Sequence, residues 1–264
     1  MDQFKRGFLR GLVGGDLNNN ISEIEWSSRV KLAATYRIFD YLGWSLLIFN
    51  HITLRLPGPK HHFLINPFGM SYNEVTASNL VKVDIDGKKI DRSEWNINQA
   101  GFLIHSAIHR HIPEAICIMH THTVEGISIS CKEQGLTNTN FYSAMIYNNI
   151  SYHDFEGITT RENEQERLLA SIGGNPLLIL RNHGLLVFGR SIEEAFIRLW
   201  TLQKACETQM ASESLEGKNI AIPEEVTKFS TDEMGLFNDA PIGQDKAFEA
   251  LERIVEKQDP SYKN

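Results

Sequence analysis

An apolar segment at residues 115–121 is the feature that most limits how this chain can fold. Its sequence, AICIMHT, is rich in apolar and β-branched residues, which is typical of a buried strand. A chain of 264 residues, 42% of them apolar, is long enough to surround such a strand with one well-developed core. The sequence therefore predicts a globular domain built on a buried sheet.

Segments with helical periodicity alternate with short apolar segments along the chain. Capping boxes predict three helix starts, at Ser22 with Glu25, Thr159 with Glu162, and Ser191 with Glu194. Further helices are expected at 98–111 and 123–131, and strands at 46–52, 62–65, 141–153, 177–180 and 185–188. Several of the loops suit hairpins. We therefore expect an α/β fold, a three-layer α/β/α domain with a central mixed, largely antiparallel sheet.

Composition divides the chain into three parts. Residues 1–21 are rich in Gly and Asn and are expected to form a flexible N-terminal arm. Residues 22–214 carry the periodic segments and form the predicted main domain. Residues 215–264 are charged and weakly patterned, and we expect a C-terminal extension with one short helix around Phe248, Leu251 and Ile254.

Charge and cysteine usage exclude several classes of partner. The formal net charge is −7 and the basic residues are scattered, so no nucleic-acid partner is expected. No apolar run approaches the roughly 18 residues needed to span a bilayer, and the first 15 residues do not resemble a signal peptide. The three cysteines fit neither a zinc motif nor a disulfide framework. We therefore expect a cytoplasmic protein in a reduced compartment, with no membrane partner.

Two histidines at the end of the buried strand are the sharpest chemical signal. His120 and His122 are two residues apart, so on a strand their side chains share one face. His183 follows another apolar segment, and Gly184 would allow a tight turn there. Three imidazoles suit a divalent metal and leave coordination positions open, as a catalytic site requires. The alternative is that they are ordinary histidines at strand ends.

Several segments resemble the class II aldolase/adducin family. They read, in order, FNHITLRLP at 49–57, LINPFGMSYNEVTASNLVKVDIDG at 64–87, NQAGFLIHSAIHRHIPEAICIMHTHT at 98–123, ILRNHGLLVFG at 179–189 and SIEEAFIRLWTLQKACETQM at 191–210. The residues of NPFG, NQAGF and the last segment are closer to those of the adducin head domain and its bacterial relatives than to those of the sugar-phosphate aldolases. The resemblance implies a three-layer α/β/α fold and a homo-oligomer, commonly a tetramer.

The resemblance also implies a metal site, with two departures. Aldolases of the family bind zinc through positions that match His120, His122 and His183, and the metal polarises a carbonyl. We therefore expect one divalent ion, Zn²⁺ first, with Fe²⁺, Mn²⁺ or Co²⁺ as alternatives. The aldolases' acid/base Glu is replaced here by Gly101, and their two phosphate-binding serines by Gln99 and Ala100. In the first phosphate loop only Asn50 is retained, because Phe49 stands where the family has Gly.

Other residues are candidates for catalysis or substrate binding, each with a structural alternative. His105 lies one helical turn after Gly101 and could replace the missing base, or shape the site as a buried helix histidine. Glu125 and Tyr142 are further catalytic candidates, the alternatives being a solvated helix start and core packing. The candidates for substrate binding are Asn50, Thr53, Arg55, Asn66, Gly69 and Gln99. The histidines expected on the surface are His61, His62, His109, His111 and His153.

Three functions compete at this stage, and whether the chain is an enzyme is open. The first is a metal-dependent lyase that cleaves a small hydroxy- or oxo-acid by retro-aldol chemistry or decarboxylation, through a metal-stabilised enolate. Decarboxylation is attractive because loss of CO₂ needs no base to start. The second is a non-catalytic, adducin-head-like module for oligomerisation or scaffolding. The third is a non-haem iron oxygenase, since three histidines can hold Fe²⁺.

Overall fold

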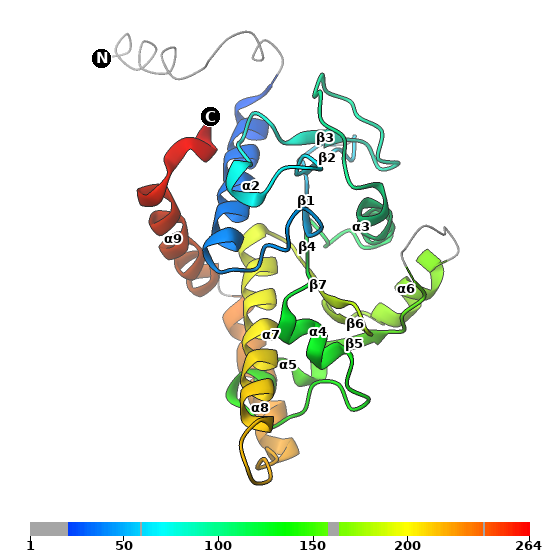
Figure 1. The fold of residues 1–264 in the computed structure, drawn as a ribbon, viewed down its shortest axis with the longest axis vertical. Helices are drawn as coiled ribbons and strands as arrows, with labels where there is room; N and C mark the ends of the chain where they lie inside the picture. Colours follow the sequence, from blue (N-terminus) through cyan, green and yellow to red (C-terminus); the bar gives the residue numbers. More distant parts are fainter. Residues whose placement is uncertain (1–20, 59, 158–163, 240) are drawn as a thin grey trace.

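The computed structural model describes residues 21–58, 60–157, 164–239 and 241–264. A seven-stranded sheet, in the order β3-β2-β1-β4-β7-β6-β5, runs through the molecule (Figure 1). The strands are β1 (His51–Arg55), β2 (Phe63–Ile65), β3 (Val81–Val83), β4 (Cys117–Thr121), β5 (Ile150–His153), β6 (Leu177–Leu180) and β7 (Gly184–Gly189). All neighbouring strands are antiparallel except β5 and β6, which are parallel. The predicted mixed, largely antiparallel sheet is confirmed.

Helices cover both faces of this sheet. They are α2 (Glu23–Tyr41), α3 (Gln99–His111), α4 (Val124–Ser130), α5 (Phe141–Ile146), α6 (Glu164–Ile172), α7 (Ile192–Glu213), α8 (Glu224–Asp239) and α9 (Pro241–Gln258). Helices α2, α4 and α7 bury the larger core against one face. Helices α3 and α6 bury a second core against the other face (Figure 1). The predicted three-layer α/β/α arrangement is confirmed.

Strand β4 lies at the centre of the sheet, between β1 and β7. All five of its residues are buried, as expected for a segment with no polar face. Its register places His120 opposite His51 of β1 and opposite Leu186 of β7. His120 therefore lies near the end of a fully buried central strand, and His122 follows directly after that strand.

Two predicted helix starts have their capping side chains in place. The Ser22 hydroxyl accepts a hydrogen bond from the Glu25 amide, and Ser191 does the same for Glu194. The carboxylate of Glu25 pairs instead with Arg29, and that of Glu194 with arginines of its own region. The third capping box, at Thr159 and Glu162, lies outside the described residues, as do residues 1–20 of the expected arm.

Two segments expected as strands differ in the structure. Strand β1 begins at His51, so the strand expected at 46–52 is displaced toward the C-terminus. Leu47 has φ of 49°, which a strand does not allow. Most of residues 141–153 forms α5 and a 3₁₀ turn, leaving only β5 as strand. The side chain of Asn140 caps α5, which packs between α7 and α8, so tertiary contacts override the β propensity of this segment.

The C-terminal segment contains two helices, α8 and α9, where one short helix was expected. Phe248 and Val255, seven residues apart on α9, are buried in the larger core with Tyr262. Phe248 packs edge-on against Phe196 of α7, with ring centroids 5.7 Å apart. The amides of Ala77 and Ser78 donate to carbonyls of residues 262 and 264. The C-terminal segment therefore shares the core of the main domain.

Candidate metal centre

Three histidines converge at one edge of the sheet, and we refer to His120, His122 and His183 as the histidine trio. One ring nitrogen of each lies within 4.8 Å of those of the other two. The Nε2 atoms of His120 and His122 are 2.8 Å apart, so both are directed at the same point. The His122 and His183 rings stack, with centroids 4.8 Å apart. Sequence positions separated by 61 residues are thus brought together, as the metal-site prediction requires.

The backbone around His183 explains how it reaches the other two. Asn182 takes the left-handed turn, with φ of 56°, in the short connection between β6 and β7. Gly184 was expected to supply that turn, but its role is different. A Cβ atom on Gly184 would lie 2.3 Å from the carbonyl oxygen of Thr121, so only glycine lets the start of β7 approach the end of β4.

A hydrogen bond to the backbone orients the His120 ring. Its Nδ1 lies 2.8 Å from the carbonyl oxygen of Leu185, which can only accept, so Nδ1 carries the proton. In the neutral ring this leaves the lone pair on Nε2, directed at His122. Such a second hydrogen bond is what usually fixes the orientation of a metal-binding histidine.

Burial keeps the trio neutral. Desolvation lowers the pKa of His122 to about 4, holds the pKa of His120 well below its usual value, and lowers that of His183. Mutual repulsion between the rings adds to the effect at His120 and His122. Three neutral, oriented imidazole nitrogens are the donor set that a borderline divalent metal prefers. The residues present therefore fit the metal that was predicted.

The space beside Gly101 is filled by His51, which the sequence reasoning did not single out. A Cβ atom on Gly101 would lie only 2.4 Å from Cε1 of His51. The His51 ring lies 4.2 Å from the His105 ring and 5.3 Å from the His120 ring, measured between centroids. The signal was present in the sequence, because His51 directly follows Asn50 of the first family segment. Its closeness to His120 depends on strand register, which the sequence does not reveal.

Behind His51 lies a second polar group, which we call the Thr53 network: Thr53, His105 and His109. The Thr53 hydroxyl is 2.7 Å from Nδ1 of His105 and 2.8 Å from Nε2 of His109. Nδ1 of His109 is 2.7 Å from the carbonyl oxygen of Ala115. All three side chains are buried. Thr53 and His105, two predicted site residues, are thus hydrogen-bonded to each other, and the His105 ring lies beside that of His51.

Three other predicted residues support the loops around the trio. Asn50 accepts a hydrogen bond from the His122 amide at 3.2 Å and donates to the Trp44 carbonyl at 2.6 Å. Asn66 is buried and accepts from the Tyr36 hydroxyl at 3.0 Å. Gly69 has φ of 102° and forms an open turn. Asn50 is the only one of these three with a hydrogen bond to a residue of the trio in the part of the chain that the structure describes.

Among the described residues, none of the remaining candidates has a hydrogen bond to the trio. Arg55, at the far end of β1, donates to the carbonyls of Pro113 and His109. Gln99 is exposed at the start of α3. Tyr142 lies on α5 and packs edge-on against Trp200, with centroids 5.6 Å apart. Glu125, in the first turn of α4, accepts from Gln203 of α7 at 3.2 Å.

Two of the histidines expected at the surface are buried. His109 is 2% exposed and belongs to the Thr53 network, and His153 is 6% exposed at the end of β5. Their burial depends on tertiary packing, so composition alone did not distinguish them. His61 and His111 are exposed and His62 is half-buried.

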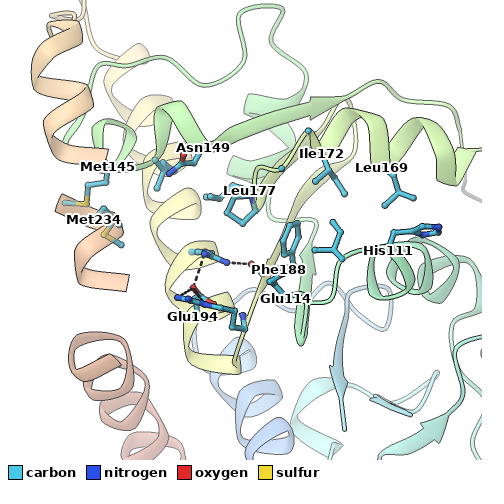
Figure 2. Close-up of a pocket in the computed structure, with 18 residues that line it drawn as sticks. His111, Glu114, Met145, Asn149, Leu169, Ile172, Leu177, Phe188, Glu194 and Met234 are labelled. Carbon is cyan, nitrogen blue, oxygen red and sulfur yellow. Dashed lines mark hydrogen bonds and ion pairs between the residues drawn. The ribbon is translucent and has the colours of Figure 1, made fainter. Parts of the chain in front are cut away.

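A cavity of about 660 Å³ lies at the other end of the strands that frame the trio (Figure 2). Leu177, the first residue of β6, and Phe188, near the end of β7, line it together with Glu194 of α7 and Met234 of α8. No member of the trio lines it. A hollow of about 10 Å³ lies beside His183, and Ile104, Phe155 and Arg181 border it. Cavity size and metal-binding chemistry therefore point to different ends of the sheet.

Comparison with known proteins identifies the family. The model of the class II aldolase and adducin N-terminal domain matches residues 30–210. This chain belongs to that family. A putative aldolase class 2 protein of Pseudomonas aeruginosa is 42% identical over 94% of this chain and 96% of its own length. Alpha-adducin of Rattus norvegicus is 47% identical over 69% of this chain, which corresponds to only 25% of the adducin.

Solved structures of the family share the fold. An L-fuculose 1-phosphate aldolase from Glaciozyma antarctica PI12 superposes with a TM-score of 0.78 at 27% identity, over 95% of this chain and 97% of that protein. The class II aldolase fold expected from the sequence is therefore confirmed. Among the described residues, no helix has the length and apolar character needed to cross a membrane.

Proposed function

We propose that this protein is a metal-dependent lyase that cleaves a small hydroxy- or oxo-acid, by retro-aldol cleavage or by decarboxylation. The observation that carries the proposal is the convergence of three neutral imidazoles in the histidine trio, of which His120 is buried and the other two are half-buried. Membership of the class II aldolase family supports a divalent metal and lyase chemistry in general terms. Zn²⁺ is the metal we expect, with Fe²⁺, Mn²⁺ and Co²⁺ as the alternatives that three imidazoles also accept.

In this proposal, the histidine trio holds the metal and Asn50 supports one of its ligands. His120, His122 and His183 would hold the metal, and the Leu185 carbonyl fixes the proton of His120 on Nδ1. A metal bound there supplies positive charge that stabilises an oxyanion as it develops on the substrate. Asn50 holds the His122 amide, so the loop that carries this ligand stays in place. An organic acid rather than a sugar phosphate is favoured, because Gln99, Ala100 and Phe49 replace family residues that bind phosphate.

Metal content and turnover together test the proposal. We expect the purified protein to bind one equivalent of Zn²⁺, measured by elemental analysis after reconstitution. The zinc-loaded protein should turn over at least one member of a library of oxo-acids and aldols, and His120→Ala should abolish both zinc binding and turnover. A zinc-loaded protein that is inactive on the whole library would contradict the lyase proposal.

A second candidate function is supported by the likeness to adducins. Alpha-adducin shares 47% identity with most of this chain. In this reading the domain serves as a non-catalytic oligomerisation or scaffold module, and we expect a homo-oligomer, a tetramer by family resemblance, in either case. Stability that does not change on chelation, together with the absence of bound metal, would favour the scaffold.

A further inference from the structure

His51 lies where a side chain from helix α3 would otherwise enter the site. It is 3% exposed, and its strand partner in the register of β1 and β4 is His120. Its ring occupies the position that a Cβ atom on Gly101 would invade, at a distance of 2.4 Å. The His51 ring in this place and any side chain at position 101 therefore exclude each other. Where the aldolases have a carboxylate from the helix, this chain has an imidazole from the strand.

Both ring nitrogens of His51 are buried without a hydrogen-bond partner. A buried polar atom left unpaired costs about 1–3 kcal/mol, so such atoms are uncommon and call for an explanation. Desolvation lowers the pKa of His51 to about 4, so the ring is neutral and has one N–H donor and one lone pair. Neither His105 nor His120 is close enough to satisfy them as the rings stand.

The Thr53 network determines what His105 presents to His51. The Ala115 carbonyl can only accept, so Nδ1 of His109 donates to it and Nε2 of His109 carries the lone pair. The Thr53 hydroxyl therefore donates to His109 and accepts from Nδ1–H of His105. Nε2 of His105 is left as a lone pair without a donor, beside the His51 ring.

This sequence of hydrogen bonds orients His51 as well. Nε2 of His105 is an unfilled acceptor beside the ring. The backbone groups of Phe49 and Gly101 that act on the pKa of His51 are acceptors as well. An N–H of His51 directed at one of these acceptors leaves the second nitrogen as a lone pair. His120, a member of the histidine trio, is another neighbour of the His51 ring, with centroids 5.3 Å apart. The lone pair therefore has no donor among the described residues, although a member of the trio neighbours the ring.

We propose that His51 is a specificity-determining residue, which accepts a hydrogen bond from a hydroxyl group of an organic acid held at the histidine trio. The inference rests on the proposed metal site and names the feature of the ligand that the site selects. A ligand with a hydroxyl donor satisfies the unpaired nitrogen of His51, whereas a ligand with an ether oxygen in the same place leaves it unpaired. His51 in this role moves no proton and acts by discriminating between ligands.

Two small acids test this selectivity on the zinc-loaded protein. Glycolate carries a hydroxyl beside its carboxylate, and methoxyacetate has the same oxygen without the hydrogen. We expect calorimetric titration to show that the wild-type protein binds glycolate about tenfold more tightly, the effect of one hydrogen bond. Equal affinities in the wild-type protein, or no binding of glycolate, would overturn the inference without any variant.

Three variants show whether His51 causes the preference. His51→Val should reduce the glycolate preference to about one, and His51→Gln, which retains an acceptor, should keep most of it. Gly101→Ala should also reduce the preference, because its Cβ displaces the His51 ring. This variant moves the imidazole without changing its chemical identity. His111→Val, a change at an exposed histidine on the same helix as His105, should leave the preference unchanged.

The remaining outcomes separate this inference from the proposed function. A preference that survives in His51→Val overturns the role of His51 and leaves the metal site standing. Loss of zinc from His51→Val by more than about a hundredfold would make His51 a metal ligand, which also overturns the inference. A wild-type protein that binds no zinc refutes the proposed function itself. If the variants do not fold, the wild-type ratio of affinities decides.

Discussion

The histidine trio and the Thr53 network both contain buried or half-buried histidines, but the hydrogen bonds to their ring nitrogens differ. In the Thr53 network a hydroxyl and a carbonyl use three of the four ring nitrogens of His105 and His109. In the trio the nitrogens of His120 and His122 meet each other, and the His183 ring stacks on His122. Burial lowers the pKa values in both groups. Hydrogen-bond partners, more than burial or pKa, therefore separate a structural histidine from a candidate ligand here.

The largest effect is expected when a member of the trio is removed. His120→Ala should weaken Zn²⁺ binding by about a thousandfold or more, because two ligands remain and substitutions that only touch a ligand's partner already cost 10–100-fold. Competition titration with a chromogenic chelator measures the change. His109→Ala, from the other group, should lower stability but change zinc affinity little. Equal losses of zinc in both variants would erase the distinction between the two groups.

Thr53→Val should be the most destabilising change within the Thr53 network. It leaves Nδ1 of His105 and Nε2 of His109 buried without partners, and we expect a loss of about 3 kcal/mol in the free energy of unfolding in urea. Thr121→Val on the neighbouring strand β4 is the matched control, because the Thr121 hydroxyl is buried without a partner. That control should be neutral or stabilising. A Thr53 variant as stable as the control would show that the network is dispensable.

Acid should destabilise the metal-free protein through the Thr53 network. Burial lowers the pKa of His109 to about 3, against about 6.5 in the unfolded chain, so the unfolded state binds more protons between these values. The stabilisation is fully present above pH 6.5 and is lost as the pH falls toward 3. We expect His109 alone to account for about 2 kcal/mol between pH 6.5 and 5.

Urea unfolding at a series of pH values measures this loss. The variant His109→Asn should reduce the slope of stability against pH by about one proton in this range. His61→Asn, at an exposed position, should leave the slope unchanged. A slope that does not respond to His109→Asn would mean that other groups carry the acid sensitivity.

The smallest expected effect concerns the loop that carries His122. Asn50→Ala removes the acceptor for the His122 amide and should weaken zinc binding roughly tenfold, as changes in the partners of metal ligands commonly do. Asn50→Asp keeps this acceptor but loses the donor to the Trp44 carbonyl, so it should fall between Ala and wild type. Calorimetric titration with Zn²⁺ resolves the three proteins, and an Ala variant with wild-type affinity would remove Asn50 from the support of the trio.

Local signals in the sequence predicted the elements that local forces decide. The caps at Ser22 and Ser191 and the buried strand β4 are confirmed, because they depend on neighbours a few residues away or on an uninterrupted apolar run. Residues 141–146 were expected as strand, and their helix is stabilised by α7 and α8, which are distant in sequence. The helix expected around Phe248 is α9, which is longer than predicted because its buried residues meet a core formed by α2 and α7. Helix α8 was not predicted.

The candidate site shows the same division. His120, His122 and His183 were found from the spacing on one strand and the resemblance to a family. His51 was missed because its place beside Gly101 follows from the pairing of β1 with β4, and no local pattern specifies that pairing. Arg55 and Thr53 lie on the same strand as His51 but farther from the trio. Sequence proximity to a family motif therefore did not predict which side chains reach the trio.

The central position of β4 has a consequence for how the protein folds. Its partners, β1 and β7, are distant in the chain, because His51 lies 69 residues before His120 and Leu186 lies 66 residues after it. Closing loops of this length costs entropy before the contacts repay it, so these pairings belong to the slow part of folding. A nascent chain contains no complete trio until His183 has been synthesised. Metal should therefore bind only after the sheet has assembled. It should slow unfolding more than it speeds folding.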